Sequence, residues 1–431
     1  MAGFTSLTER LFRSIKIYQD YLHSAGLPQP SHTVASSDGT VNPAPFTVHS
    51  LPDDVAAALE DAKEASHELH LLLLSPVEQI TSFVPNFSRT LSLSFITKYR
   101  IAEKLAPSEK KSFKALADEC NLDENDLRRM LRLAMTDHIF DEPERNMVAH
   151  TKASLALVTV PNLAFWAEGF TGTCASMTEL PVAMGRWPGS EKETETAGAL
   201  YRKMKGLPES FWEHLKLNPE LAVKFGKRME FISSNPTVAV AGFVKAYDFS
   251  KLPPDAIFVD VGGSHGKAAI AVAETHPSIR CIVQDISQPT INAARTNLPA
   301  HLKDRVEFQV YDFWHEQPIK GADVYFFRWI FHDWSDTHAV KLLKTLIPSL
   351  KAGSRVVINE RCLPSHGEAS AYKQRQHRIT DLMMKSLANA KERDAEEWKA
   401  IFDATDPRFK FQPIVKPPGL QIAIIEAIWD P

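Results

Sequence analysis

The sequence is poor in the features that mark secreted, metal-stabilised or membrane-spanning proteins. Only four cysteines occur in 431 residues, and none has a CxxC or Cys/His spacing suited to zinc or a disulfide framework. No apolar run approaches the roughly 20 residues that span a bilayer. The N-terminal stretch carries Glu9, Arg10, Arg13 and Lys16 where a signal peptide needs an uninterrupted apolar centre. We therefore expect a cytoplasmic protein without membrane attachment.

Charge of one sign is also scarce. The chain has 49 Lys and Arg against 53 Asp and Glu, a formal net charge of −4. This balance excludes binding driven mainly by positive charge, so no nucleic-acid partner is expected. With 44% hydrophobic and 24% charged residues the composition is that of an ordinary globular protein. At roughly 100 to 200 residues per domain, the length suits two or three domains.

The first 185 residues predict a helical domain. Residues 27–55 collect Pro, Ser, Gly and Asn without any period and predict an irregular connector. From residue 55 to about 175 apolar residues recur at helical spacing, and residues 112–143 predict a helix-turn-helix with a wing. Residues 101–150 hold eight basic and eleven acidic side chains. Because an acidic unit binds DNA poorly, we expect this one to serve dimerisation.

A different pattern begins after residue 185. Strand-like runs at 256–263, 280–285, 305–312, 322–331 and 354–360 alternate with helical segments. This alternation predicts an α/β, Rossmann-like domain with a mainly parallel sheet and helices on both faces. The last two runs, 409–415 and 420–428, are joined by four residues only. They predict a C-terminal hairpin, which would make one strand of the sheet antiparallel.

Acidic residues and glycines follow the ends of the predicted strands. Asp260 runs into Gly262 and Gly263 before a helix, and Asp285 and Asp312 end the next two strands. Glycines allow close backbone approach to a ligand, and an acid about 20 residues later suits a ribose diol. Alone, the loop could be a simple turn and each acid a helix cap. Together they indicate an adenosine site, although GGSHG lacks the GxGxxG pattern of dinucleotide folds.

The motifs VDVGGSHG, DFW, FFRWIFHDWSD, NERCLP and AKERDAEEW, in this order, resemble the plant and fungal O-methyltransferases that use S-adenosyl-L-methionine. ASHELHLLLL, RRMLRLAMTDHIFDEP and VAHT resemble the N-terminal part of that family, so the likeness covers nearly the whole chain. It implies a helical, winged-helix dimerisation domain over residues 1–185 and a class I methyltransferase domain over 186–431. It also implies a homodimer that acts on a small molecule.

The resemblance assigns roles to particular side chains. His332 matches the general base, Glu360 and Glu392 match the two acids beside it, and Asp333 follows it. Neighbouring strand ends would also bring His332 and Glu360 together, and a carboxylate prepares a histidine to take a hydroxyl proton. No metal is implied. The residues assigned to the cofactor are Asp260, Gly262, Gly263, Asp285, Asp312, Phe313 and Arg328.

Three positions depart from the family pattern. Ser264 stands where many members have a third glycine, which a small residue should tolerate. Ala390 replaces the usual glycine before the KER segment, and Asp394 replaces the usual threonine. We expect the added carboxylate of Asp394 to alter the field around Glu392.

Two activities remain compatible with these motifs. His332, Glu360 and Glu392 favour methyl transfer to a hydroxyl of an aromatic or polyketide-derived, fungal-type secondary metabolite. Fungal relatives of this family also include proteins that keep S-adenosylmethionine bound but catalyse dehydration or a pericyclic reaction, such as a hetero-Diels-Alder or Alder-ene step. A histidine base serves a dehydration as well. A regulatory protein without catalysis is disfavoured, because it gives these groups no reason to stay together.

Overall fold

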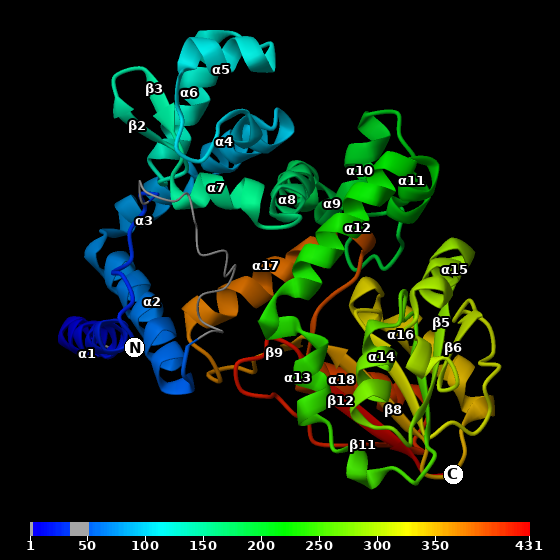
Figure 1. Ribbon diagram of the computed structural model, residues 1–431. Helices are drawn as coiled ribbons and strands as arrows, with labels where there is room; N and C mark the ends of the chain where they lie inside the picture. Colours follow the sequence, from blue (N-terminus) through cyan, green and yellow to red (C-terminus); the bar gives the residue numbers. More distant parts are fainter. Residues whose placement is uncertain (1–2, 35–50) are drawn as a thin grey trace. The chain divides into compact units, whose positions relative to one another are not determined.

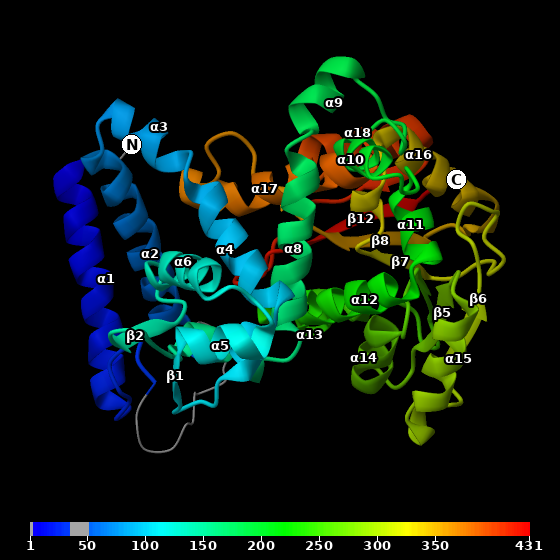
Figure 2. The ribbon, with the colours of Figure 1, turned by 90° about the horizontal axis from the view of Figure 1, so that it is seen from above.

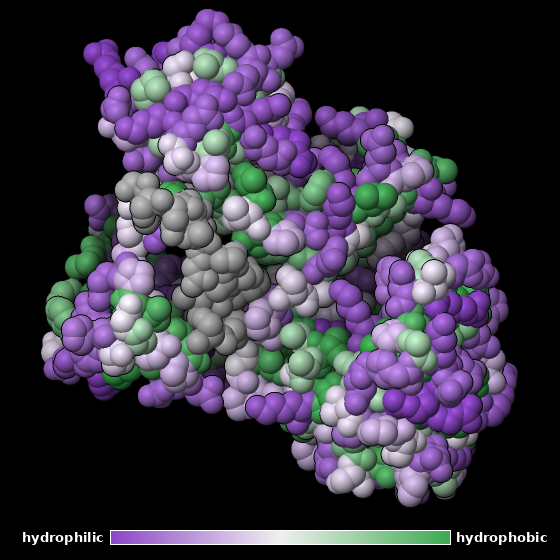
Figure 3. Space-filling model, in the orientation of Figure 1, coloured by the Kyte–Doolittle hydropathy of each residue, from purple (hydrophilic) through white to green (hydrophobic). Residues whose placement is uncertain are grey.

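The computed structural model describes residues 3–34 and 51–431 and divides the chain into two compact units (Figure 1). The first comprises Met1–Ala175 and Leu215–Asn235, and the second comprises Ser176–His214 and Pro236–Pro431. Most of the connector expected at residues 27–55 lies outside the described residues. No helix in the described part of the chain is long and apolar enough to cross a membrane. Hydrophilic side chains cover much of the face shown in Figure 3.

The division differs from the boundary expected after residue 185. Helix α12 (Pro219–Ser234) belongs to the first unit because it packs on α8 (Leu163–Met177). Lys224 forms a 2.7 Å ion pair with Glu168, and the rings of Phe231 and Trp166 lie 5.6 Å apart. Conversely, α9 (Leu180–Arg186) joins the second unit through a small apolar cluster with α10 (Ala197–Met204).

The first unit is helical with one small sheet. Helices α1 (Phe4–Ser24) and α2 (Asp53–Leu73) lie side by side (Figure 2), where Arg10 and Ser14 donate hydrogen bonds to Asp61 at 2.5 and 2.7 Å. Helices α3 (Pro76–Phe83) and α4 (Asn86–Lys98) follow. Strands β1 (Lys110–Ser112), β3 (Met147–Ala149) and β2 (Asp141–Glu144) form an antiparallel sheet in that order. It accompanies α5 (Phe113–Cys120), α6 (Glu124–Met135) and α7 (Lys152–Thr159).

The second unit is built on a seven-stranded sheet of order β11-β12-β8-β7-β4-β5-β6. Strands β4 (Ile257–Val261), β5 (Arg280–Asp285), β6 (Val306–Val310), β7 (Val324–Arg328) and β8 (Arg355–Glu360) run parallel. Strand β12 (Ala423–Trp429) is antiparallel to β8, with Ile425 opposite Ile358, and to β11 (Phe409–Phe411). The mainly parallel α/β sheet expected from the strand spacing is confirmed.

Helices cover both faces of this sheet because its strands are apolar on both sides. On one face Phe258 and Phe326 pack with α13 (Val240–Ala246), α14 (Lys267–Thr275) and α15 (Gln288–Asn297). On the other, Val259 and Phe327 pack with α16 (Asp336–Leu346) and α18 (Ala395–Thr405). Helix α17 (Ala371–Ala388) packs on β9 (Cys362–Leu363) and on the 3-10 turn η6 (Phe331–Asp333). Strand β10 (Arg393–Asp394) pairs with β9, and α11 spans Phe211–Leu217.

Candidate active site

The sheet has a topological switch point between β4 and β7. From β4 the chain continues outward through β5 and β6, and then returns to place β7, β8 and β12 on the other side. Open α/β sheets bind ligands in the crevice beside such a point, outside the carboxyl ends of the strands. All the expected site residues except Glu392 lie at or just past these strand ends, and Glu392 comes from the segment between α17 and β10.

The loop after β4 has no room for side chains at its glycines. Gly262 has a φ of +74°, and a Cβ there would lie 2.5 Å from the Ile330 side chain. A Cβ at Gly263 would lie 2.5 to 2.9 Å from the Asp260 carboxyl group. The two glycine N–H groups donate to the carbonyl oxygen of Gln284 at 2.8 and 3.0 Å. The backbone therefore packs tightly where the sequence predicts close approach to a ligand.

Ser264 occupies the backbone conformation that explains the glycine usual there. Its φ is +51°, in the left-handed region that a glycine adopts at no steric cost. The Ser264 N–H donates to Asp285 Oδ2 at 3.0 Å, and the Ser287 N–H donates to Asp285 Oδ1 at 2.9 Å. Asp285 thus stands beside the glycine loop and accepts a hydrogen bond from its backbone. The third glycine is replaced at a strained but hydrogen-bonded position.

Asp260 lies beneath the loop and supports it. Its carboxylate is buried and accepts the Ala269 N–H at 3.3 Å, and burial raises its pKa to about 7. Arg328, expected near an adenine, is engaged inside the protein by the Asn359 side chain and the Val238 carbonyl. Burial lowers the pKa of Arg328 to about 10, against the opposing effect of Asp260 and of a second buried carboxylate, described below. Both residues are therefore bound to protein groups and support the backbone around the candidate site.

Asp312 and Phe313 join an aromatic group at the end of β6. Asp312 Oδ1 accepts the Trp314 N–H at 3.0 Å. The Phe313 ring lies edge-on to the Trp314 and Trp334 rings, with centroids 5.1 and 6.2 Å away. The loop backbone, the start of α14, two strand-end carboxylates and these rings fit an adenosine group, which needs close backbone, hydroxyl acceptors and a flat apolar surface.

The turn after β7 is strained, and Glu360 holds it. Trp329 has a φ of +56°, a rare conformation for a bulky residue. Glu360 Oε1, fully buried at the end of β8, accepts the N–H groups of Ile330 and Phe331 at 2.7 and 2.6 Å. Burial raises the pKa of Glu360 to about 7. Glu360 therefore fixes the backbone that carries His332, and its carboxylate also acts electrostatically on the imidazole.

His332 lies between two carboxylates. Its Nδ1 is 3.3 Å from Glu392 Oε1 and its Nε2 is 3.7 Å from Asp333 Oδ1. Burial acts to lower the pKa of His332, but Asp333, Glu392 and Glu360 outweigh it and raise the pKa to about 9. Burial also raises the pKa of Asp333. The resting side chain is consequently an imidazolium at neutral pH, oriented by Glu392.

Arg393, which the sequence analysis missed, ties the His332 turn to Glu392. Its fully buried guanidinium donates to the carbonyls of Phe331 and Trp334 at 3.0 and 2.7 Å and to Asp336 at 2.8 Å. One residue before it in the chain, Glu392 is held by its N–H, which donates to Asp381 at 3.0 Å. The signal for Arg393 in the sequence was its place in AKERD, directly after Glu392, to which the resemblance assigned a role.

The added acid Asp394 caps a helix. Its Oδ1 accepts the Glu397 N–H at 2.9 Å, and the Glu397 side chain accepts the Asp394 N–H at 3.0 Å, a capping box that begins α18. Asp394 therefore has the structural role a threonine also performs, since either residue can accept an N-cap hydrogen bond. No pairing between Asp394 and Glu392 is seen in the described part of the chain.

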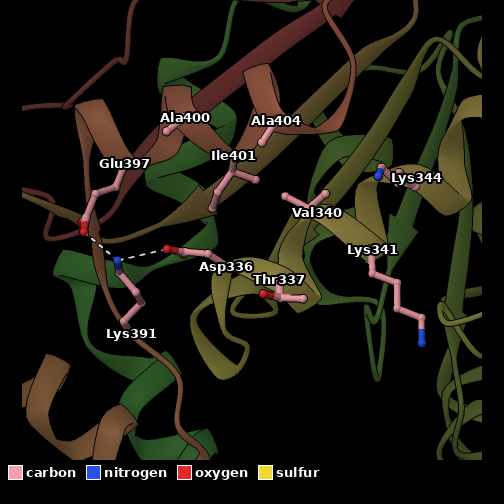
Figure 4. A pocket seen from close by; sticks show the side chains of 10 residues that line it. All are labelled: Asp336, Thr337, Val340, Lys341, Lys344, Lys391, Glu397, Ala400, Ile401 and Ala404. Carbon is pink, nitrogen blue, oxygen red and sulfur yellow. Dashed lines mark hydrogen bonds and ion pairs between the residues drawn. The ribbon is translucent and has the colours of Figure 1, made fainter. Parts of the chain in front are cut away.

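A groove of about 670 Å³ lies between α16 and α18 (Figure 4). Lys391 spans its edge, with Nζ 3.2 Å from Asp336 and 2.6 Å from Glu397. Its remaining lining is an apolar strip with two lysines, and it contains none of the expected site residues. Because Lys391 directly precedes Glu392, the two ion pairs at the edge of the groove help to hold the segment that carries Glu392.

A family model of the O-methyltransferase domain matches residues 190–406. O-methyltransferase kk1A of Curvularia clavata is 35% identical over 431 aligned residues, which cover 99% of this chain and 97% of that protein. Among solved structures, OxaC in complex with sinefungin and meleagrin has a TM-score of 0.75 at 21% identity, covering 98% of this chain and 99% of its own. A structure titled a pericyclic reaction enzyme has a TM-score of 0.69 at 22% identity, covering 86% and 94%.

The similarity to these solved structures agrees with the fold of the switch-point sheet. The chain belongs to the O-methyltransferase family, and it is an enzyme of that class.

Proposed function

We propose that the protein transfers a methyl group from S-adenosylmethionine to a hydroxyl of an aromatic or polyketide-derived small molecule of fungal-type secondary metabolism, with His332 as the base. The observation that carries this proposal is the His332 imidazole, held by Glu392 on a turn that Glu360 fixes, at the same sheet edge as the glycine loop. Names such as O-methyltransferase kk1A support the reaction class.

The cofactor would be held by the groups after β4, β5 and β6. Asp285 offers a carboxylate to the ribose hydroxyls, Asp312 and Phe313 offer an acceptor and a ring face to the adenine, and Gly262 and Gly263 allow close approach. When bound, S-adenosylmethionine supplies a methyl group on a positively charged sulfur. The protein's own task is then to position the acceptor oxygen and to remove its proton.

His332 performs the proton transfer in its neutral form. Glu392 orients the ring through Nδ1, so Nε2 is the nitrogen left to face a substrate hydroxyl, and after the transfer the imidazolium is stabilised by Glu392 and Asp333. Because the pKa of His332 is about 9, only a small fraction is neutral at pH 7. The specificity constant kcat/KM should therefore rise with pH up to about 9, as the neutral fraction of His332 grows.

The test is the fate of a labelled methyl group. Methyl-labelled cofactor and a panel of fungal phenols and 2-pyridones are incubated with the wild type and with His332→Gln. Label in the product, with one S-adenosylhomocysteine formed per turnover, supports the proposal. General base catalysis contributes about 10² to 10⁴ in rate, so His332→Gln should lose about that factor. Retention of full activity in this variant overturns the assignment of His332.

A second candidate is dehydration or a pericyclic reaction with the cofactor left intact. The geometry that favours it is the place of the His332 ring between Glu392 and Asp333, because two carboxylates stabilise a charged ring that can donate a proton or a hydrogen bond to a substrate carbonyl or leaving hydroxyl. The same assay separates the two. Substrate that is dehydrated or rearranged while the label stays on the cofactor selects this candidate.

We further propose that the first unit is a winged-helix dimerisation domain and that the protein is a homodimer. The support is α3 and the residue that follows it, where four apolar side chains stand 69 to 75% exposed: Val77, Ile80, Phe83 and Val84. Contiguous exposed apolar surface of this kind marks an interface. By light scattering we expect a dimer that Phe83→Glu weakens and that the exposed control Ser82→Glu, on the same helix, leaves intact. A wild-type monomer at micromolar concentration refutes this.

A further inference from the structure

Arg361 carries a guanidinium group whose hydrogen-bond donors are only partly paired within the described part of the chain. It follows Glu360 at the end of β8, and its Nη2 donates to Gln421 at 3.0 Å. Its Nε and Nη1 are buried and have no hydrogen-bond partner among the described residues. Buried guanidinium donors without acceptors are costly, because the desolvation of the charge is not repaid. An acceptor from outside the chain would complete them.

Among the described residues, two ring nitrogens near Arg361 also lack a hydrogen-bond partner, as do the second carboxylate oxygens of Glu360 and Glu392. Its guanidinium carbon lies 5.8 Å from the centroid of the Trp329 ring, whose Nε1 is buried without a partner in the part of the chain that is described. The Trp329 ring is in turn 5.0 Å from the His332 ring. His377 on α17, which packs on the segment after Arg361, has an unpartnered Nδ1 within the same described region. The Trp329 ring therefore lies near both the His332 ring and the Arg361 guanidinium with its unpaired nitrogens.

Arg361 and His332 are the two cations of this cluster, and Glu392 acts on both. Burial lowers the pKa of Arg361, and the opposing carboxylate that acts on it is Glu392. Glu392 also binds the His332 imidazolium, on which Asp333 and Glu360 act as well, so the carboxylate that acts on Arg361 is shared between two cations. Burial and the nearby Arg361 charge lower the pKa of His377, which leaves that ring neutral. A negatively charged group would give Arg361 a partner that it does not share with His332.

We propose that Arg361, with Trp329 and His377 beside it, forms an anion subsite next to His332, and that the substrates are phenols bearing a carboxylate on the same aromatic ring. This inference rests on the proposed function, because it names the substrate class of the same site. The hydroxyl would face His332 and the carboxylate would accept from Arg361. The unpaired Nε and Nη1 point in different directions, so the carboxylate would accept a charge-assisted hydrogen bond from one of them.

The test compares an acid with its ester, which keeps the phenol and removes the negative charge. Calorimetry measures the affinity of 2,4-dihydroxybenzoate and of methyl 2,4-dihydroxybenzoate for the full chain loaded with S-adenosylhomocysteine. We expect the acid to bind about 10- to 100-fold more tightly, as charge-assisted hydrogen bonds provide. Arg361→Met should remove this preference and leave the ester unchanged. Arg361→Lys should retain part of it, and the exposed α17 control Arg375→Met should retain all of it.

Equal affinities of acid and ester, no measurable binding of the acid, or a preference that survives in Arg361→Met would overturn the subsite. Unchanged affinity for S-adenosylhomocysteine shows that each variant is folded. Methyl transfer is scored separately with labelled cofactor. An acid preference that depends on Arg361 without label transfer keeps the subsite and refutes methyl transfer. If label is transferred equally to acid and ester, and Arg361→Met does not change this, methyl transfer is supported and the anion subsite is refuted.

Discussion

Replacing Asp333 by Asn should lower the pKa of His332, because it removes a negative charge from beside the imidazolium. The change keeps the size and the hydrogen-bonding shape of the side chain. In the wild type, Asp333 Oδ1 is 3.7 Å from His332 Nε2, and the side chains are 27% and 14% exposed. With fewer negative charges the protonated ring is less stable, so its pKa falls below the wild-type value of about 9.

The size of the effect follows from the distance. Two unit charges 3.7 Å apart attract by about 1.1 kcal/mol at the dielectric constant of water and by about 4.5 kcal/mol at an effective constant of about 20. These energies correspond to about 0.8 to 3 pH units. Because both side chains keep some contact with solvent, we expect a fall of about 1 to 2 units. Glu392→Gln should also lower the pKa, and the double variant should approach or fall below the ordinary 6.5.

The measurement is an NMR titration of histidine ring carbons in selectively labelled protein, with His332→Gln identifying the signal of His332. It requires no substrate and is independent of the turnover assay. The exposed Asp304→Asn on the same unit is the control and should leave the midpoint unchanged. Where a substrate is available, the acid limb of the kcat/KM profile should move to lower pH with the NMR midpoint.

A midpoint near 9 in Asp333→Asn would refute this reasoning, because the charge assigned to Asp333 would then not act on the ring. A wild-type midpoint near 6.5 would refute the premise that the resting side chain is an imidazolium.

Three further outcomes follow from the same geometry. Glu360→Ala leaves the buried N–H groups of Ile330 and Phe331 unpaired and should lower the free energy of unfolding by about 2 to 4 kcal/mol in a denaturant titration, whereas Glu360→Gln, which keeps an acceptor, should cost less. Asp285→Ala should weaken S-adenosylhomocysteine binding by about 10- to 100-fold in calorimetry, and unchanged affinity would contradict its assignment. The His332 pKa is about 9 in the folded state and about 6.5 unfolded, so its contribution of up to about 3 kcal/mol is complete below pH 6.5 and lost as pH rises through 9. The stability of the wild type relative to His332→Gln should fall over that window.

Local patterns in the sequence were sufficient for the parallel sheet and for the residues at its carboxyl edge. The strand-like runs and the acids that end them are short-range features, so Asp260, Asp285 and Asp312 could be placed at strand ends. The sequence did not show that Glu360 binds the backbone of a strained turn or that Arg393 holds two of its carbonyls, because both depend on contacts between segments 29 to 62 residues apart.

The division into compact units differs from the expected boundary for the same reason. Helix α12 reads as an ordinary amphipathic helix, and only its packing on α8, through Lys224 and Phe231, assigns it to the first unit. Arg361 lies in a motif that the sequence analysis quoted, yet its charge looked ordinary there. Its burial and its unpaired donors become visible only in three dimensions.

The interleaving of the two units has a consequence for folding during synthesis. A chain that has emerged only to residue 177 already contains α8, but the ring of Trp166 lacks Phe231 and Glu168 lacks Lys224 until α12 follows some 50 residues later. At ribosomal rates of about 5 to 20 residues per second, the interval lasts seconds. During it the apolar face of α8 is open to wrong pairings, which makes this stretch a point where chaperones would be needed. A fragment cut at residue 185 would keep that exposed face permanently.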